Sequence, residues 1–153
     1  MRKIRFRTPL FSLSATLALA CAAQAPGPEE AIRETVQAML AAVEEKDPGG
    51  VLEPVSFEYR GEEGLGYADV QSLVLTFLLW EEPIGVRLQS LSIESLGASG
   101  QQRVQARVAF ARGVRLRQSP RPLPLGSVEY SFDLVFAPDG AAWKAVRGTY
   151  RRL

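Results

Sequence analysis

The sequence predicts an α+β domain in which two helices pack on one face of an antiparallel sheet. Apolar residues recur every three or four positions in residues 29–45 and 68–80, which is the period of an amphipathic helix. After Pro83 the period changes to two, and strand patterns alternate with turn sequences as far as the C-terminus. Helices followed by a run of strands are typical of α+β domains.

The first helix is predicted to begin at Pro28 and to end at Glu45. Proline suits a first helical position, and the two glutamates after it suit the positive end of the helix dipole. The sequence Asp47-Pro48-Gly49-Gly50 is expected to stop the helix. Its apolar stripe consists of Ile32, Val36, Met39 and Val43.

The middle of the chain predicts a short helical turn at 51–55, a short strand at 56–60 and a glycine-rich loop at 61–66. The second helix follows over 68–80 and ends ahead of Pro83, because a residue that precedes proline avoids helical geometry. The side expected to be buried carries Val70, Leu73, Val74, Phe77 and Leu78.

Further strands are predicted at 86–95, 104–110, 128–136 and 143–150. In the first of them the alternation slips near Ser90, which indicates a β-bulge. The last two are expected to form a hairpin, because Ala137-Pro138-Asp139-Gly140 is a turn sequence.

Residues 1–20 have the layout of a secretory signal peptide, with a basic start and an uncharged apolar stretch at 10–20. The only cysteine, Cys21, follows directly, and Ala18-Leu19-Ala20-Cys21 resembles the lipobox of bacterial lipoproteins. That resemblance implies cleavage before Cys21, lipidation of its thiol and a tether at 21–28. Because Ala18-Leu19-Ala20 is also an ordinary cleavage signal, plain secretion is the alternative. Ala22 stands where an aspartate would favour the inner membrane, so we expect the periplasmic face of the outer membrane.

From residue 29 to residue 153 the chain resembles the nuclear transport factor 2-like (SnoaL-like) domains of small bacterial lipoproteins. The order of elements carries the resemblance, together with the stretches 55–60, 130–134 and 143–147 and the second helix through Phe77. It implies a cone-shaped fold, with N-terminal helices on a curved sheet and a pocket at the open end of the cone. The fold hosts enzymes, binding proteins and dimerisation modules alike, so it does not fix the function.

Composition excludes several kinds of chemistry. The chain has no histidine, which excludes Ser-His-Asp triads, HExxH zinc sites and facial-triad iron sites, and Cys21 is assigned to the lipid. We therefore expect neither a metal nor a cofactor. Without the leader, 14 basic residues face 17 acidic ones, so the overall charge does not favour nucleic acid.

Asp133, in the middle of a predicted strand, is the candidate base for an isomerase or cyclase of this fold. Its side chain should lie on the face opposite Tyr130 and Phe132, away from the pocket if those point inward. The alternative is that Asp133 and Glu129 pair across the sheet with Arg103 or Arg107.

Basic residues concentrate in the last third of the chain, with 10 basic and 3 acidic residues after position 100. One interpretation is a basic face for an anionic partner, built by Arg103, Arg107, Arg115 and Arg117. The other is a salt-bridged outer sheet surface. Four large aromatic residues either line an apolar pocket or are part of the core, namely Tyr59, Trp80, Tyr130 and Trp143.

The leading hypothesis is a lipid-anchored envelope domain without catalytic activity that binds a small apolar ligand or an envelope protein. The alternatives are an isomerase or cyclase that uses a pocket carboxylate instead of an imidazole, and a structural module that forms a homodimer. The expected partners are the membrane, through the lipid, and the ligand or protein, with no nucleic acid.

Overall fold

The computed structural model describes residues 26–116 and 121–153. The predicted signal peptide at 1–20, the lipidation site Cys21, most of the tether and Arg117 lie outside the described residues. Among the described residues, no helix is long and apolar enough to cross a membrane.

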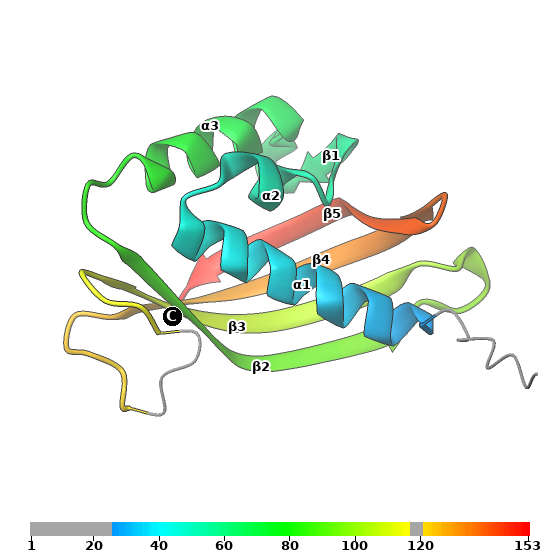
Figure 1. The fold of residues 1–153 in the computed structure, drawn as a ribbon. Coiled ribbons are helices and arrows are strands. Elements are labelled where there is room, and N and C mark those ends of the chain that lie inside the picture. Colours follow the sequence, from blue (N-terminus) through cyan, green and yellow to red (C-terminus); the bar gives the residue numbers. More distant parts are fainter. Residues whose placement is uncertain (1–25, 117–120) are drawn as a thin grey trace, which may run out of the picture.

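The elements follow the predicted order (Figure 1). The helices are α1 (Pro28–Glu45), α2 (Pro48–Leu52) and α3 (Tyr67–Leu78), and a 3-10 turn at Glu62–Gly64 precedes α3. The strands are β1 (Val55–Gly61), β2 (Ile84–Ser95), β3 (Gln102–Arg112), β4 (Val128–Asp139) and β5 (Ala142–Arg152).

The sequence Asp47-Pro48-Gly49-Gly50 does more than end α1. The carboxylate of Asp47 accepts a hydrogen bond of 3.0 Å from the backbone N–H of Gly49, and Pro48 occupies the first helical position. A capping aspartate followed by proline starts a helix, so the predicted helical turn begins at Pro48 instead of residue 51.

The five strands form one sheet in the order β1-β5-β4-β3-β2. All neighbours are antiparallel except β1 and β5, which are parallel. The predicted α+β class with helices on a curved sheet is confirmed, and the parallel pair departs from a purely antiparallel sheet. A parallel neighbour requires a long connection, which here runs through α3 and the other three strands.

The predicted bulge in β2 is confirmed by a register shift between Leu88 and Ser90. The shift lets Leu88 and Leu91 face the same side although they are three positions apart, so both apolar runs of the strand point inward. A second shift, opposite Val135 and Phe136 of β4, leaves Val146 of β5 unpaired and bends β5.

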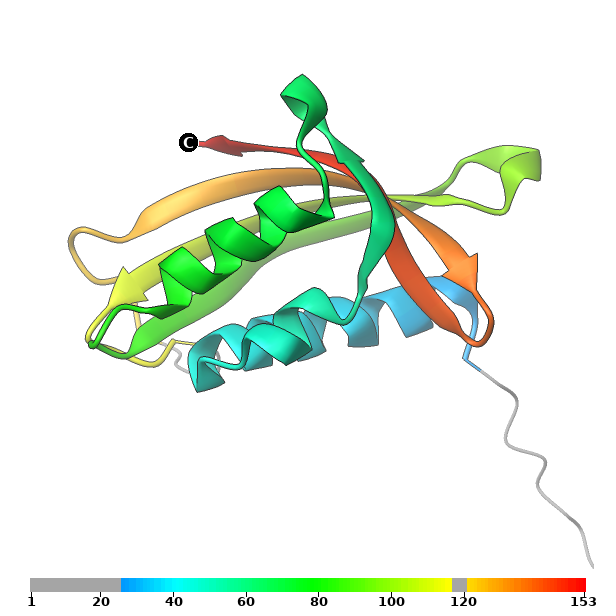
Figure 2. The same cartoon turned by 90° about the horizontal axis from the view of Figure 1, so that it is seen from above.

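The two longer helices, α1 and α3, lie on the concave side of the sheet (Figures 1 and 2). The core joins the buried side of α1 to the inward residues of the strands, among them Phe136 with 0% exposure. Burial of each large apolar side chain stabilises the fold by about 1.5–3 kcal/mol. The buried residues of α1 are Ile32, Val36, Leu40, Ala42 and Val43.

The carboxylate of Glu44 connects three parts of the chain. Its Oε1 atom accepts hydrogen bonds from the backbone N–H of Val86, at 3.1 Å, and of Leu116, at 2.9 Å. These bonds fix the end of α1 against the edge strand β2 and against the loop that follows β3. An edge strand whose N–H group is occupied in this way is less available to other chains.

Phe136→Ala is expected to lower the free energy of unfolding by about 3–5 kcal/mol, because it leaves a cavity at a fully buried position. Leu125→Ala is the matched control, since Leu125 is fully exposed, and should change it by less than about 0.5 kcal/mol. Urea unfolding followed by circular dichroism measures both. Equal losses in the two variants would contradict the assigned core.

Candidate ligand-binding face

A continuous row of aromatic side chains, here called the aromatic row, crosses the concave side of the sheet. Its ring centroids are separated by 4.7 Å between Trp80 and Phe77 and by 5.4 Å between Phe77 and Phe110. From Phe110 the row continues to Tyr130 at 5.8 Å. The ring of Tyr130 lies 6.3 Å from those of Phe132 and Tyr150. These separations are typical of favourable tilted and edge-to-face pairs. The members are Phe77, Trp80, Phe110, Tyr130, Phe132 and Tyr150.

The aromatic row is only partly covered. β4 has a neighbouring strand on each side, yet its inward residues from Val128 to Leu134 are only half-buried. Tyr150 on the neighbouring strand β5 is 46% exposed. Above this part of the sheet, α3 buries a single residue, Leu78. The concave face therefore presents apolar surface that neither helix covers, which is typical of a ligand-binding or interaction surface.

The hydroxyls of Tyr130 and Tyr150 belong to the aromatic row, whereas Tyr59 is buried beside Gly148. Burial, and secondarily the neighbouring Tyr150, raises the pKa of Tyr59, so its hydroxyl stays protonated at neutral pH and can donate a hydrogen bond. A Cβ atom at Gly148 would lie 3.0 Å from this hydroxyl and 2.3 Å from Leu134, so only glycine leaves room here. Within the described chain, the hydroxyls of Tyr59, Tyr130 and Tyr150 have no hydrogen-bond partner.

A separate open groove of about 630 Å³ lies between α1, α2 and the β4–β5 turn. Its lining includes alanines of α1, Trp143, and the carboxylate residues Glu34, Glu45 and Glu53. The groove therefore combines small apolar and acidic residues, and it shares no lining residue with the aromatic row.

The four aromatic residues proposed for a pocket do not line a common space. Tyr59 is buried beside Gly148, Tyr130 and Trp80 belong to the aromatic row, and Trp143 lines the groove beside α1. Trp80 is further fixed by Arg112, whose guanidinium lies 3.4 Å from the ring centroid. Stacking of a guanidinium on indole is a favourable cation–π contact.

Sequence reasoning assigned Phe77, Phe110 and Phe132 to buried faces, and it did not single out Tyr150. Period-two alternation places Phe110 and Phe132 on the inward side, but it cannot show that α3 leaves this side open. The available signal was the concentration of rings on inward positions of three consecutive strands.

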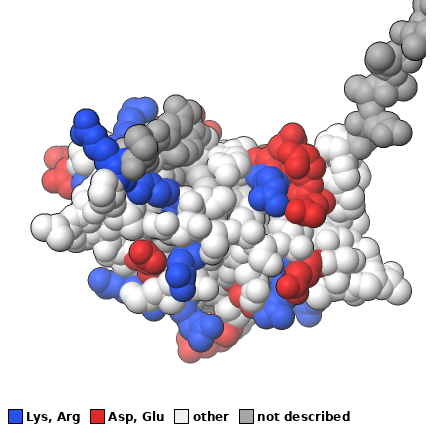
Figure 3. Space-filling view, turned by 90° about the horizontal axis from the view of Figure 1, so that it is seen from below, with Lys and Arg blue, Asp and Glu red and all other residues white. Residues whose placement is uncertain are grey.

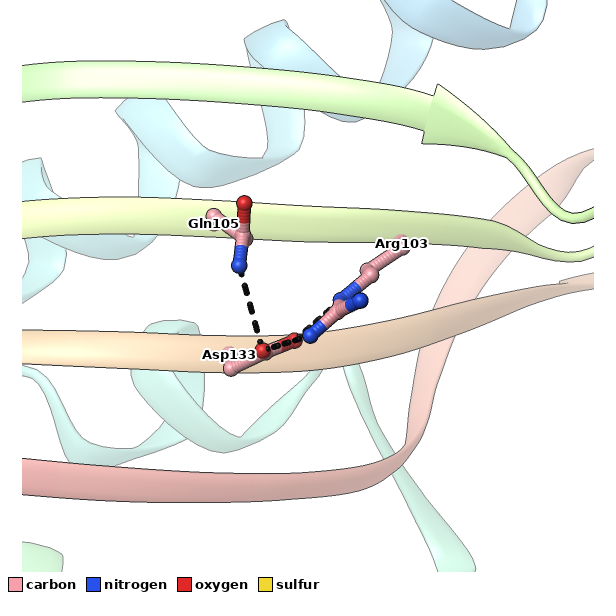
Figure 4. Close-up of polar contacts among 3 residues, drawn as sticks. All are labelled: Arg103, Gln105 and Asp133. Carbon is pink, nitrogen blue, oxygen red and sulfur yellow. Dashed lines mark hydrogen bonds and ion pairs between the residues drawn. The ribbon is translucent and has the colours of Figure 1, made fainter.

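Asp133 lies on the outer face of the sheet, as the alternation predicts (Figure 4). Its carboxylate accepts a hydrogen bond of 2.9 Å from Nε of Arg103, a second one from Nη2 of Arg103 and one of 3.2 Å from Nε2 of Gln105. These partners, Arg103 first, lower the pKa of Asp133. The expected pairing with an arginine is therefore confirmed for Asp133, and a base facing the cone is excluded at this position.

The same expectation was wrong for Glu129. Glu129 lies opposite Ala109 and has no ion pair among the described residues. The register places Arg103 opposite Val135 and Arg107 opposite Ser131 instead.

The arginines proposed as one basic face have different surroundings. Arg103 is bound to Asp133, Arg107 lies on the outer face opposite Ser131, Arg115 is exposed in the loop after β3, and Arg117 lies outside the described residues. In the view from below, basic and acidic side chains are interspersed (Figure 3). The described part of the chain contains no group of three or more acidic, histidine or cysteine side chains that could hold a metal ion.

Comparison with solved structures identifies the fold. A proposed scytalone dehydratase from Novosphingobium aromaticivorans superposes with a TM-score of 0.65 at 12% identity, over 82% of this chain and 83% of the other. A nuclear transport factor 2-like protein of unknown function from Pseudomonas putida gives 0.61 at 12% identity, over 80% and 84%. An uncharacterised protein with a cystatin-like fold from Caulobacter vibrioides gives 0.62 at 14% identity, over 82% and 89%.

The domain therefore has the nuclear transport factor 2-like fold that the sequence resembles. At these identities the similarity concerns the fold and not the activity. No family model and no curated protein matches the sequence.

The pKa of the Asp133 carboxyl is expected to rise when Arg103→Gln removes its main partner. Because the pKa is lowered in the folded protein, the pair stabilises the fold above the unfolded pKa, and this contribution is lost as the pH falls through the lowered value. Carbon-13 NMR titration of the Asp133 carboxyl measures the shift, with Arg33→Gln on α1 as the control. An unchanged Asp133 titration in Arg103→Gln would refute the pairing.

Proposed function

We propose that this chain is an envelope lipoprotein whose domain binds a small apolar ligand on the concave aromatic face, without catalysing a reaction. The observation that carries the proposal is the aromatic row, which remains half-exposed although it lies on the inner face of the sheet. Apolar surface on a concave face is the usual setting of small-molecule sites.

The chemistry of the face defines the ligand class. The rings of the aromatic row offer apolar surface for a planar or polycyclic molecule, and the hydroxyls of Tyr130 and Tyr150 can form hydrogen bonds with one or two of its oxygen atoms. In such sites the hydroxyl groups fix the orientation of the ligand, while the rings provide most of the binding energy. The ligand is therefore expected to be aromatic or steroid-like in shape, and neutral.

The absence of a suitable base supports binding instead of catalysis. No polar or charged side chain is buried in the part of the chain that the structure describes. The inward positions of β4 carry apolar and aromatic residues, while the carboxylates Glu129 and Asp133 occupy its outer positions. Although some structures of the same fold carry enzyme names, the described residues place no carboxylate on the inward positions of β4, where the isomerase or cyclase alternative would require one.

The proposed anchor would hold the domain close to the membrane. Only five residue steps separate Cys21 from Pro26, which corresponds to at most about 18 Å of extended chain. The start of α1 lies at the same end of the molecule as the β2–β3 and β4–β5 turns (Figure 1). This end would then face the membrane, and the arginine-containing loop after β3 would point away from it.

A neutral hydroxylated aromatic, 2-naphthol, is expected to bind residues 26–153 at the aromatic row. Phe132→Ala should weaken binding roughly 10-fold, because it removes one stacking surface and its buried area. Isothermal titration calorimetry of the wild-type and variant domains measures the affinities.

Trp143→Ala is the control, since Trp143 lines the groove beside α1 and not the aromatic row. If this variant lost binding and Phe132→Ala retained it, the site would be the groove. If the wild-type domain converted 2-naphthol or related enols to other products, a purely binding function would be excluded.

Cys21→Ala is expected to move the protein from the membrane fraction to the soluble periplasmic fraction, because the cysteine thiol is the proposed lipid site. Cell fractionation followed by immunoblotting measures the distribution, and metabolic labelling with a radioactive fatty acid detects the lipid. A Cys21→Ala protein that still sedimented with membranes would show that the attachment lies elsewhere.

A further inference from the structure

Four side chains form a line across four strands on the outer face of the sheet. The registers pair Ser90 of β2 with Arg107 of β3, Arg107 with Ser131 of β4, and Ser131 with Arg151 of β5. Adjacent strands lie about 4.8 Å apart, so the two arginines start about 10 Å apart with Ser131 between them. We call these four residues the outer row.

Three residues of the outer row, Ser90, Arg107 and Ser131, line a shallow hollow of about 330 Å³, and Arg151 lies beyond Ser131 on β5. Residues with hydroxyl, amide and guanidinium groups line it, together with Leu91 and Ala106, and no carboxylate residue takes part. The bulge in β2 contributes directly, because it brings Ser90 opposite Arg107 on the outer side. The lining residues are Ser90, Leu91, Ser92, Gln105, Ala106, Arg107 and Ser131.

Arg107 differs from Arg103 and Arg147 on this face, because it has no bonded partner within the described residues. Arg103 is bound to Asp133, and Arg147 donates to Oε1 of Gln101 at 3.4 Å. Within the described residues, Arg107 makes neither a hydrogen bond nor an ion pair. Arg151 makes no direct bond either, and its charge acts at longer range on Asp133.

We propose that the outer row binds a phosphate group above Ser131, held between Arg107 and Arg151. Guanidinium groups present paired N–H donors that match two oxygens of a phosphate, and the serine hydroxyls can donate to a third. The site lies on the opposite side of the sheet from the aromatic row, so it is independent of the proposed apolar ligand.

The acidic groups nearby set limits on the affinity. Asp133 and Glu129 lie two residues on either side of Ser131 along β4. Asp133 is neutralised by Arg103 and Gln105, whereas Glu129 has no ion pair among the described residues and will repel an anion. Two arginines against one uncompensated carboxylate leave a net positive site, whose affinity should fall as the salt concentration rises.

The test is calorimetric titration of the full chain, purified in a non-ionic detergent at low ionic strength, with inorganic phosphate and separately with glycerol 3-phosphate. We expect saturable binding of one phosphate group per chain, weakened at least 10-fold by Arg107→Gln and by Arg151→Gln. Both side chains are exposed, so the variants should fold, and circular dichroism checks this. Tighter binding of the ester would indicate a headgroup-like phosphate, and tighter binding of the inorganic ion would indicate free phosphate.

Arg33→Gln removes an equal charge from α1, where Arg33 pairs with Glu29, and is the matched control. It should change the affinity less than twofold. Ser131→Ala tests the middle of the outer row without changing the charge, and should weaken binding about threefold. Absence of saturable binding, or an equal loss in Arg33→Gln and Arg107→Gln, would overturn the proposal.

Discussion

The two β-bulges are the constraint on which the rest of this structure depends. In β2 the apolar residues before and after Gln89 follow opposite parities, so a regular strand would turn one of the two runs outward. The bulge between Leu88 and Ser90 keeps both runs inside. In β5 a bulge at Val146 does the same for Ala145 and Gly148, whose positions have opposite parities. Bulges also increase twist and bend a sheet, so the requirement to bury both runs produces the curvature.

Curvature then determines which surfaces the helices can cover. The long helix α1 fills the part of the concave side next to β2, where Glu44 fixes its end to the edge strand and to the following loop. The shorter α3 contacts β1 and α2 and leaves the inward side of β4 half-exposed. The sequence pattern of the aromatic row is that of an ordinary buried sheet face. The row stays partly exposed because neither α1 nor α3 covers it completely.

Local signals in the sequence predicted the elements and the direction of most side chains. The alternation along 128–136 was sufficient to place Asp133 outside, and the slip at Ser90 was sufficient to locate a bulge. Contacts between segments far apart in the chain were not predictable in this way. The parallel pairing of β1 with β5, the contact of Phe77 with Phe110, and the alignment of Arg151 with Arg107 all depend on strand order and register, which period and composition do not encode.

The two faces of the sheet have opposite chemistry for a common reason. Successive side chains of a strand point to opposite faces, so the strands that supply rings to the concave side present their intervening residues, many of them polar, on the convex side. On β4 this places Ser131 between Tyr130 and Phe132, and on β5 it places Arg151 beside Tyr150. A change of register that removed the aromatic row would also break the outer row, whereas single substitutions on either face alter one face alone. The proposed apolar-ligand and phosphate sites thus share one scaffold but can be separated by mutation.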